Sequence, residues 1–105
     1  MSKPKYNLSF LPIFQEDLYE VTDYITNALK NPGAAHRLLD DIEFAISKRL
    51  EMPLSFPKYQ SSKLRKQVYY RINVRNFSIF YVVIGNTMEV RRLLHAKKNI
   101  DEFLR

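Results

Sequence analysis

A change of hydrophobic period in the C-terminal half constrains the fold of this 105-residue chain more than any other feature. Residues 68–75 alternate apolar and polar side chains, which predicts a strand with one buried face and one basic face. Residues 77–84 are apolar almost throughout, as is typical of a central strand covered on both faces. We expect a turn at Asn76 and a two-residue hairpin at Gly85-Asn86, followed by a strand over residues 87–94. The pattern therefore predicts a three-strand antiparallel meander.

Two helical stripes precede this meander. Apolar residues in the first stripe follow helical spacing: Phe14, Leu18, Val21, Ile25 and Ala28. The second stripe contains Leu38, Ile42, then Ala45 or Ile46, and then Arg49 or Leu50, and we expect the helix to end at Pro53. Asn31-Pro32-Gly33 separates the stripes, so we predict an antiparallel two-helix hairpin. With a short strand at residues 6–10 and a short helix at residues 99–104, the chain should form one α+β domain over residues 1–105.

Charge is distributed unevenly along the chain, which has a formal net charge of +6. Residues 1–57 carry a net charge of −2. Residues 58–98 carry ten Lys or Arg and a single acid, Glu89, which gives a net charge of +9. This concentration attracts a polyanion or an acidic protein surface. A solvated basic face is the simpler alternative, and we favour an anionic partner.

The sequence also lacks the features of several protein classes. It has no cysteine, so disulfides and thiolate zinc sites are excluded. It has no stretch that could span a membrane and no secretory signal, so we expect a soluble cytoplasmic protein without a membrane partner. Glycine-rich phosphate loops and cofactor motifs are missing, so we expect no cofactor. Glu16, Glu20 and Asp23 share a helical face with no neighbouring histidine, so we expect no metal site.

Four segments together resemble the RelE/ParE superfamily of type II toxins. Residues 17–25 are similar to the first-helix pattern of ParE-like members, and residues 50–53 resemble their L-x-x-P exit from the second helix. Residues 70–81 resemble the strand pair of their meander. Residues 93–99 are similar to their final V-x-H-x-R-R-D segment. The resemblance implies the RelE/ParE toxin fold and a toxin that a cognate antitoxin, encoded beside it, neutralises.

Members of this superfamily act in two ways. ParE-like members inhibit DNA gyrase, and RelE-like members cleave messenger RNA in the ribosome without a metal. The long first helix and the L-x-x-P exit favour the ParE-like branch, so gyrase inhibition is our first hypothesis. A ribosome-dependent mRNA endonuclease is the alternative. A third hypothesis is an inactive nucleic-acid-binding relic.

Ribonuclease chemistry would need a base for the ribose 2′-hydroxyl and cations for the charge on the phosphorane. The candidate catalytic residues, if the chain is a nuclease, are His95, Arg71 and Lys98. Two departures weaken this hypothesis. The position of a strand arginine in RelE-like nucleases is Ser78 here, and the C-terminal segment offers Phe103 and Leu104 instead of a tyrosine or histidine.

Other basic residues are candidates for binding nucleic acid or another target. They are Lys63, Arg65, Lys66, Arg75, Arg91, Arg92 and Lys97. Tyr69 is the best candidate for an exposed aromatic that stacks on a base. His95 has an equally acceptable structural role, in which it closes the end of the last strand through a hydrogen bond to the backbone.

Overall fold

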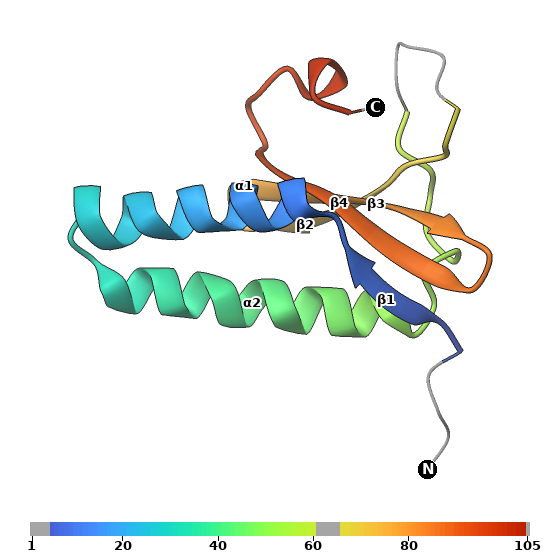
Figure 1. The fold of residues 1–105 in the computed structure, drawn as a ribbon, viewed down its shortest axis with the longest axis horizontal. Coiled ribbons are helices and arrows are strands. Elements are labelled where there is room, and N and C mark those ends of the chain that lie inside the picture. The colour runs from blue at the N-terminus through green and yellow to red at the C-terminus, as the bar shows by residue number, and fades with distance from the viewer. Residues whose placement is uncertain (1–4, 61–65, 105) are drawn as a thin grey trace.

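The computed structural model describes residues 5–60 and 66–104. Two helices lie on one face of a four-stranded sheet, and a C-terminal turn lies on the other side of the sheet (Figure 1). The elements in chain order are β1 (Asn7–Phe10), α1 (Pro12–Asp23), η1 (Tyr24–Ala28), α2 (Pro32–Leu50), β2 (Tyr70–Val74), β3 (Phe77–Ile84), β4 (Thr87–His95) and η2 (Ile100–Glu102). The predicted α+β order of strand, helical hairpin and three-strand meander is confirmed.

The sheet has the strand order β1-β4-β3-β2. β2, β3 and β4 pair antiparallel as predicted, with Ile72 opposite Ile79 and Ile79 opposite Leu93. β1 pairs parallel with β4, from Asn7 opposite Thr87 to Phe10 opposite Val90. The helical hairpin makes this parallel pairing possible, because it carries the chain across the sheet before β2 begins.

Local chemistry accounts for the helix boundaries. Pro12 and Pro32 each stand in the first turn, where a missing N–H costs nothing. Asn31 caps α2, since its Oδ1 accepts a hydrogen bond from the Ala34 N–H at 3.1 Å. The first predicted helix continues beyond α1 as the wider π-helical turn η1. None of the helices that the structure describes is long and apolar enough to cross a membrane.

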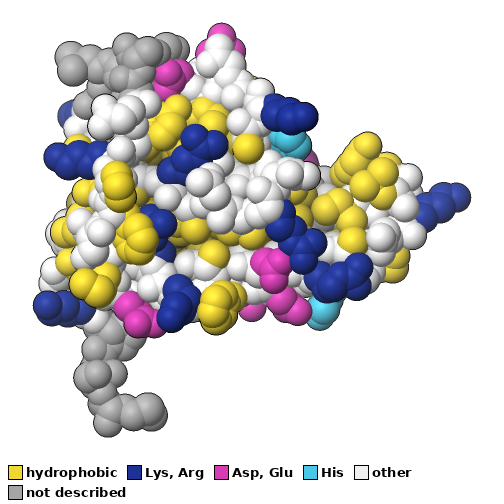
Figure 2. All heavy atoms as spheres, turned by 180° about the vertical axis from the view of Figure 1, so that it is seen from behind, with side chains coloured by type: hydrophobic (Ala, Val, Ile, Leu, Met, Phe, Trp, Pro, Cys, Tyr) yellow, Lys and Arg dark blue, Asp and Glu magenta, His cyan; other side chains and the backbone are white. Residues whose placement is uncertain are grey.

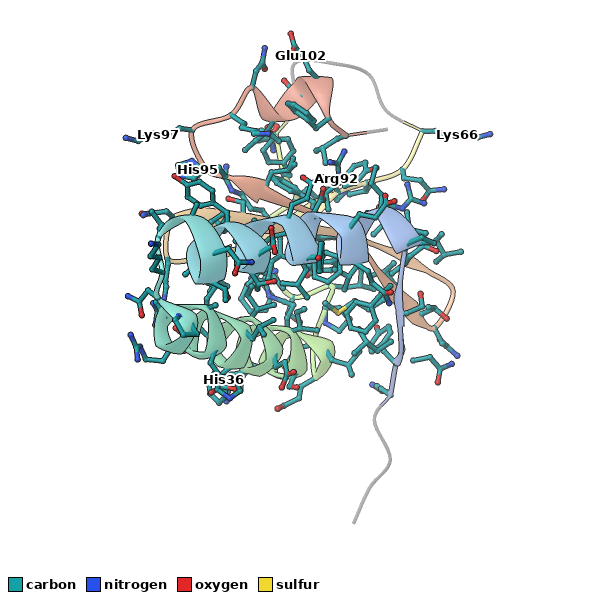
Figure 3. The ribbon with its side chains drawn as sticks, turned by 60° about the vertical axis from the view of Figure 1, so that its left-hand side comes forward. His36, Lys66, Arg92, His95, Lys97 and Glu102 are labelled. Carbon is teal, nitrogen blue, oxygen red and sulfur yellow. The ribbon has the colours of Figure 1, made fainter. Side chains whose placement is uncertain are left out.

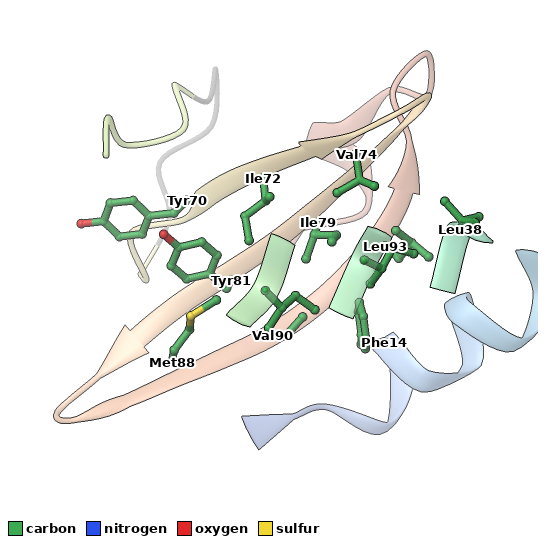
Figure 4. Packing of buried hydrophobic residues seen from close by; sticks show 12 residues of the cluster. Phe14, Leu38, Tyr70, Ile72, Val74, Ile79, Tyr81, Met88, Val90 and Leu93 are labelled. Carbon is green, nitrogen blue, oxygen red and sulfur yellow. The ribbon is translucent and has the colours of Figure 1, made fainter. Parts of the chain in front are cut away.

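The main core lies between the helices and the sheet (Figure 4). The predicted stripes supply its helical side through Phe14, Leu38 and Ile42, each no more than 2% exposed. Ile79 and Tyr81 of β3 supply the opposite side and are fully buried. The Tyr81 ring stacks on Tyr70, with 5.3 Å between the ring centroids.

A second, smaller core lies on the sheet face that the helices do not cover. Phe80 and Val82 of β3 pack there against Ile100 and Leu104 of the C-terminal segment. This cover explains why residues 77–84 lack polar alternation. Tyr69 belongs to the same cluster and is 3% exposed. The prediction that Tyr69 is an exposed stacking residue was therefore wrong, because a single C-terminal turn is enough to bury it.

The hairpin turns differ in which residue takes the left-handed conformation. Gly85 has φ +60°, which glycine adopts at no steric cost. In the β2–β3 turn Arg75, next to the expected Asn76, has φ +54°. A side chain in this region costs about 1 kcal/mol or more. The turn therefore carries local strain at an arginine.

The connection from α2 to β2 is irregular but anchored. The Tyr81 hydroxyl donates a hydrogen bond to the Pro53 carbonyl at 2.7 Å. Arg49 donates from one guanidinium nitrogen to the Tyr81 hydroxyl at 2.9 Å and to the Arg71 carbonyl at 3.2 Å. These bonds hold the end of α2 and the loop after it against β2 and β3.

Candidate functional site

His95 closes the end of β4. Its Nδ1 accepts a hydrogen bond from the backbone N–H of Lys97 at 3.2 Å, and its carbonyl accepts the Lys98 N–H at 3.0 Å. A ring nitrogen that accepts a hydrogen bond carries no proton, so the neutral ring holds its proton on Nε2. The imidazole meets the Phe77 ring edge to face at 5.5 Å. The predicted structural role of His95 is thus present in the structure.

A groove of about 330 Å³ runs past His95 along β4. His95 and Arg92 lie between α1 and the C-terminal turn (Figure 3). Glu16 and Glu20 of α1 also line this groove, as does Lys98. The expectation that these carboxylates have no histidine nearby was wrong, because α1 packs along β4. No group of three His, Cys, Asp or Glu among the described residues could hold a metal ion.

Arg71 lies on the opposite side of the sheet and forms a small polar cluster. Its Nε donates to Asn73 Oδ1 at 2.9 Å and to Ser78 Oγ at 2.8 Å. Ser78 is fully buried and donates in turn to Asn73 Oδ1 at 3.0 Å. The Arg71 guanidinium carbon lies 5.6 Å from the Phe80 ring centroid. Ser78 and Asn73 therefore fix the direction of a partly exposed guanidinium.

The structure separates two of the three candidate catalytic residues. His95 pairs with Phe77, whose ring packs on the helix-side core. Arg71 pairs with Phe80, which belongs to the core on the other face. His95 and Arg71 therefore point to opposite faces of the sheet. Lys98 stays with His95, and its ammonium nitrogen lies 4.9 Å from the Phe103 ring centroid.

Arg92 is held by Asp17 of α1. Its Nε and one terminal nitrogen donate to the two carboxylate oxygens at 2.8 and 2.9 Å, and Asp17 Oδ2 also accepts the Leu93 N–H at 3.0 Å. The hydrogen bond to Asp17 raises the pKa of Arg92 above its usual value. Arg92 donates as well to the Phe103 carbonyl at 3.1 Å. One ion pair thus joins α1, β4 and the C-terminal turn.

This ion pair sits at an irregularity of the sheet. Tyr81 pairs with Val90 and Phe80 with Arg92, so Arg91 forms a bulge. β1 ends opposite Val90, so none of the described strands neighbours β4 on that side beyond Val90. There the Asp17 carboxylate accepts the hydrogen bond of the Leu93 N–H. A side chain of α1 therefore continues the pairing that β1 begins.

The remaining candidate cations have different surroundings. Arg91 donates to Glu89 at 2.8 Å and to the Tyr69 hydroxyl at 3.2 Å. Arg75 pairs with Asp41 of α2 at 2.7 Å. Lys66 and Lys97 are exposed and point outward on different sides (Figure 3). Lys63 and Arg65 lie outside the described residues. The arginines of the basic half are thus largely engaged within the fold.

A larger and more apolar groove lies on the helix side of the molecule. Its volume is about 590 Å³. β1, α1 and α2 together line it, mainly through the apolar residues Leu8, Phe10, Phe14, Leu18, Leu39, Ile42 and Ile46, with Gln15, Glu43 and Ser47 as its polar lining residues. Leu8 and Phe10 remain 37% and 39% exposed, so the groove offers apolar surface to a partner.

Sequence reasoning missed Asp17 and Ser78 as structural determinants. Asp17 lies three residues after Phe14 and four before Val21, so helical spacing places its carboxylate on the buried side. A carboxylate there needs a partner, and this was the available signal. Nothing local to Ser78 indicates its role, because its two partners come from a different strand.

Comparisons with known proteins agree with this architecture. No curated protein matches the chain. The ParDE system of P. aeruginosa matches with a TM-score of 0.75 and 15% identity, covering 90% of this chain and 100% of that one. The RelB-RelE complex of Methanococcus jannaschii matches with a TM-score of 0.50 and 29% identity, covering 91% and 99%. The DinJ-YafQ toxin-antitoxin complex of E. coli matches with a TM-score of 0.55 and 9% identity, covering 87% and 92%.

The family described as the ParE toxin of the type II toxin-antitoxin system parDE matches residues 8–100. This match spans β1 from its second residue, the other three strands, both main helices and the first residue of η2. It extends over far more than half of the chain. The chain therefore belongs to the ParE toxin family of type II toxin–antitoxin systems, within the RelE/ParE superfamily.

Proposed function

We propose that this toxin arrests bacterial growth by inhibiting DNA gyrase and that a cognate antitoxin neutralises it. Family membership supports the toxin role, and the ParE-like branch supports gyrase as the target. The observation that carries the choice of mechanism is the separation of His95 and Arg71 on opposite faces of the sheet. A nuclease would need its base and its cations around one phosphate.

The surroundings of His95 also argue against a nuclease. A general base must accept the substrate proton on a free nitrogen. Nδ1 of His95 already accepts the Lys97 N–H, and the neutral ring then carries its proton on Nε2. No side chain with a hydroxyl group is among the described residues that line the groove around His95. This arrangement favours a toxin that binds its target without cleaving it.

The proposed antitoxin has an obvious place to bind. The groove between β1, α1 and α2 has the apolar lining that the hydrophobic stripe of an amphipathic segment requires. Three similar solved structures contain toxin–antitoxin systems or complexes. These observations support an antitoxin that covers the helix side of this chain.

One observation favours the alternative of mRNA cleavage. The Arg71 guanidinium is oriented by Asn73 and Ser78, and no carboxylate of the described residues pairs with it. An arginine held in this way suits a phosphate group. The alternative therefore makes Arg71, together with the outer face of the sheet, the place where RNA would bind.

Induction of the chain without its antitoxin tests the proposal. Growth, plasmid supercoiling and the ends of ribosome-bound mRNA should be followed in parallel for wild type, His95→Ala and Arg71→Ala. We expect growth arrest and altered supercoiling for all three proteins, with intact mRNA. New mRNA ends that disappear in either variant would refute gyrase inhibition in favour of cleavage. Normal growth with folded wild-type protein would refute the toxin role itself.

A further inference from the structure

Exposed apolar side chains gather where α2 ends. Met52, Leu54 and Phe56 are 61%, 52% and 44% exposed, and Val68 is 48% exposed. The Tyr69 carbonyl accepts the Tyr59 N–H at 2.8 Å, which places Val68 beside this loop. We call these four residues, Met52, Leu54, Phe56 and Val68, the loop patch. In Figure 2, seen from behind, hydrophobic side chains gather on the left among Lys and Arg side chains.

The loop patch is fixed in its exposed position. Pro53, in the middle of the loop, is fully buried, and its carbonyl accepts the Tyr81 hydroxyl at 2.7 Å. The Arg49 guanidinium carbon lies 3.6 Å from the centroid of the Phe56 ring. The chain is thus anchored at Pro53, and the side chains of Met52 and Leu54 on either side of it remain in solvent. Such a preorganised apolar surface loses little entropy when a partner covers it.

The charges around the loop patch restrict its partner. Lys48, Arg49 and Lys58 flank it, against one exposed acid, Glu51. A second copy of this chain would bring the same positive charges to the same place, and like charges across an interface oppose association. A partner with acidic and apolar side chains meets both properties of the surface.

We infer that the loop patch binds an acidic amphipathic segment of the antitoxin, as an extension of the apolar groove between β1, α1 and α2. This inference rests on the antitoxin partnership proposed above. α2 leads directly from the groove at Ile46 to the loop patch at Met52. α2 rises about 6 Å from Ile46 to its end at Leu50, and Met52 follows two residues later, so about four residues of extended chain can span the distance. One continuous segment can therefore cover both surfaces.

Binding of the antitoxin to variants of the full chain tests this inference. The probe is the cognate antitoxin protein, purified with the toxin and then separated from it. Met52→Ser and Leu54→Ser remove apolar area without touching an anchor. We expect each to raise the Kd about tenfold and the pair about 100-fold. Glu51→Lys should lower the Kd about threefold, because it replaces the acidic charge beside the loop patch with a basic one.

Tyr24→Ser is the matched control. Tyr24 is 59% exposed and begins η1. The turn that joins the two helices lies at the opposite end of α2 from the loop that follows Leu50 (Figure 1). We expect Tyr24→Ser to leave the Kd unchanged. All variants should retain the wild-type circular dichroism spectrum and should still arrest growth when induced alone.

Three results would overturn the inference. The first is an unchanged Kd in the double variant. The second is a loss of growth arrest in the folded double variant, which would assign the loop patch to the target. The third is that the chain binds vesicles with anionic headgroups, that this binding is lost in the double variant, and that the Kd of the double variant for the antitoxin is unchanged. A toxin that fails to inhibit gyrase would leave the predicted Kd changes intact, so the two proposals fail separately.

Discussion

Asp17→Ala should be one of the most destabilising single changes in this chain. Asp17 makes two hydrogen bonds to Arg92 and one to the Leu93 N–H, all between 2.8 and 3.0 Å. Its loss leaves Arg92, among the described residues, with the Phe103 carbonyl as its remaining hydrogen-bond acceptor, and it leaves the Leu93 N–H of the edge strand without Asp17. The change therefore disturbs α1, β4 and the C-terminal turn together.

The size of the effect follows from the burial of the pair. Removal of one partner from a buried ion pair costs about 3–5 kcal/mol. The side chains of Arg92 and Asp17 keep 15% and 12% exposure, so water partly solvates the arginine that is left. We therefore expect the lower end, about 3 kcal/mol. At about 4 °C per kcal/mol for a chain of this size, the Tm should fall by about 12 °C.

Urea unfolding of the purified chain measures this cost. Asp17→Ala, Arg92→Ala and the double variant form a cycle, and we expect a coupling energy above about 1 kcal/mol. Asp41→Ala is the matched control, because its ion pair with Arg75 is 48% exposed on both sides. That change should cost less than about 1 kcal/mol. Equal costs for Asp17→Ala and Asp41→Ala would refute the role given to the buried pair.

Three further changes test the remaining interactions. Burial raises the pKa of Tyr81 above its usual value, so the unfolded chain loses this proton at a lower pH than the folded chain does. The free energy of unfolding should therefore fall as the pH rises above about 10, and it should fall less steeply in Tyr81→Phe. Equal slopes for the two proteins in urea unfolding at alkaline pH would contradict this. Ser78→Ala removes the hydroxyl that orients Arg71 and should cost about 1–3 kcal/mol by urea unfolding, while growth arrest persists. Arg75→Gly relieves the left-handed strain but loses the pair with Asp41, so thermal unfolding should show a net change within about 1 kcal/mol.

Periodicity alone was sufficient to predict most of the fold. The stripe from Phe14 to Ile25 and the alternation from Tyr70 to Val74 each report a surface that must be buried, and the structure buries both. The parallel pairing of β1 with β4 was beyond this kind of reasoning. It depends on where the helical hairpin returns the chain, which no local pattern encodes.

The candidate site was harder to predict for a physical reason. Closeness in sequence placed His95, Lys97 and Lys98 together, and Lys98 does line the groove with His95. Arg71 was grouped with them by charge, although strand alternation sends it to the other face. A bulge in a strand changes which face of the sheet the following residues occupy. The bulge at Arg91 could not be predicted from the alternation of apolar and polar residues in this strand.

A supercoiling assay with purified DNA gyrase tests the central claim most directly. Wild-type toxin and a variant carrying both His95→Ala and Arg71→Ala should be titrated against gyrase and relaxed plasmid, with the same toxins added to translating ribosomes in parallel. We predict that both proteins inhibit gyrase at the same concentration and that the mRNA stays intact. If supercoiling is unimpaired, and if the wild type cleaves mRNA while the double variant does not, gyrase inhibition is contradicted.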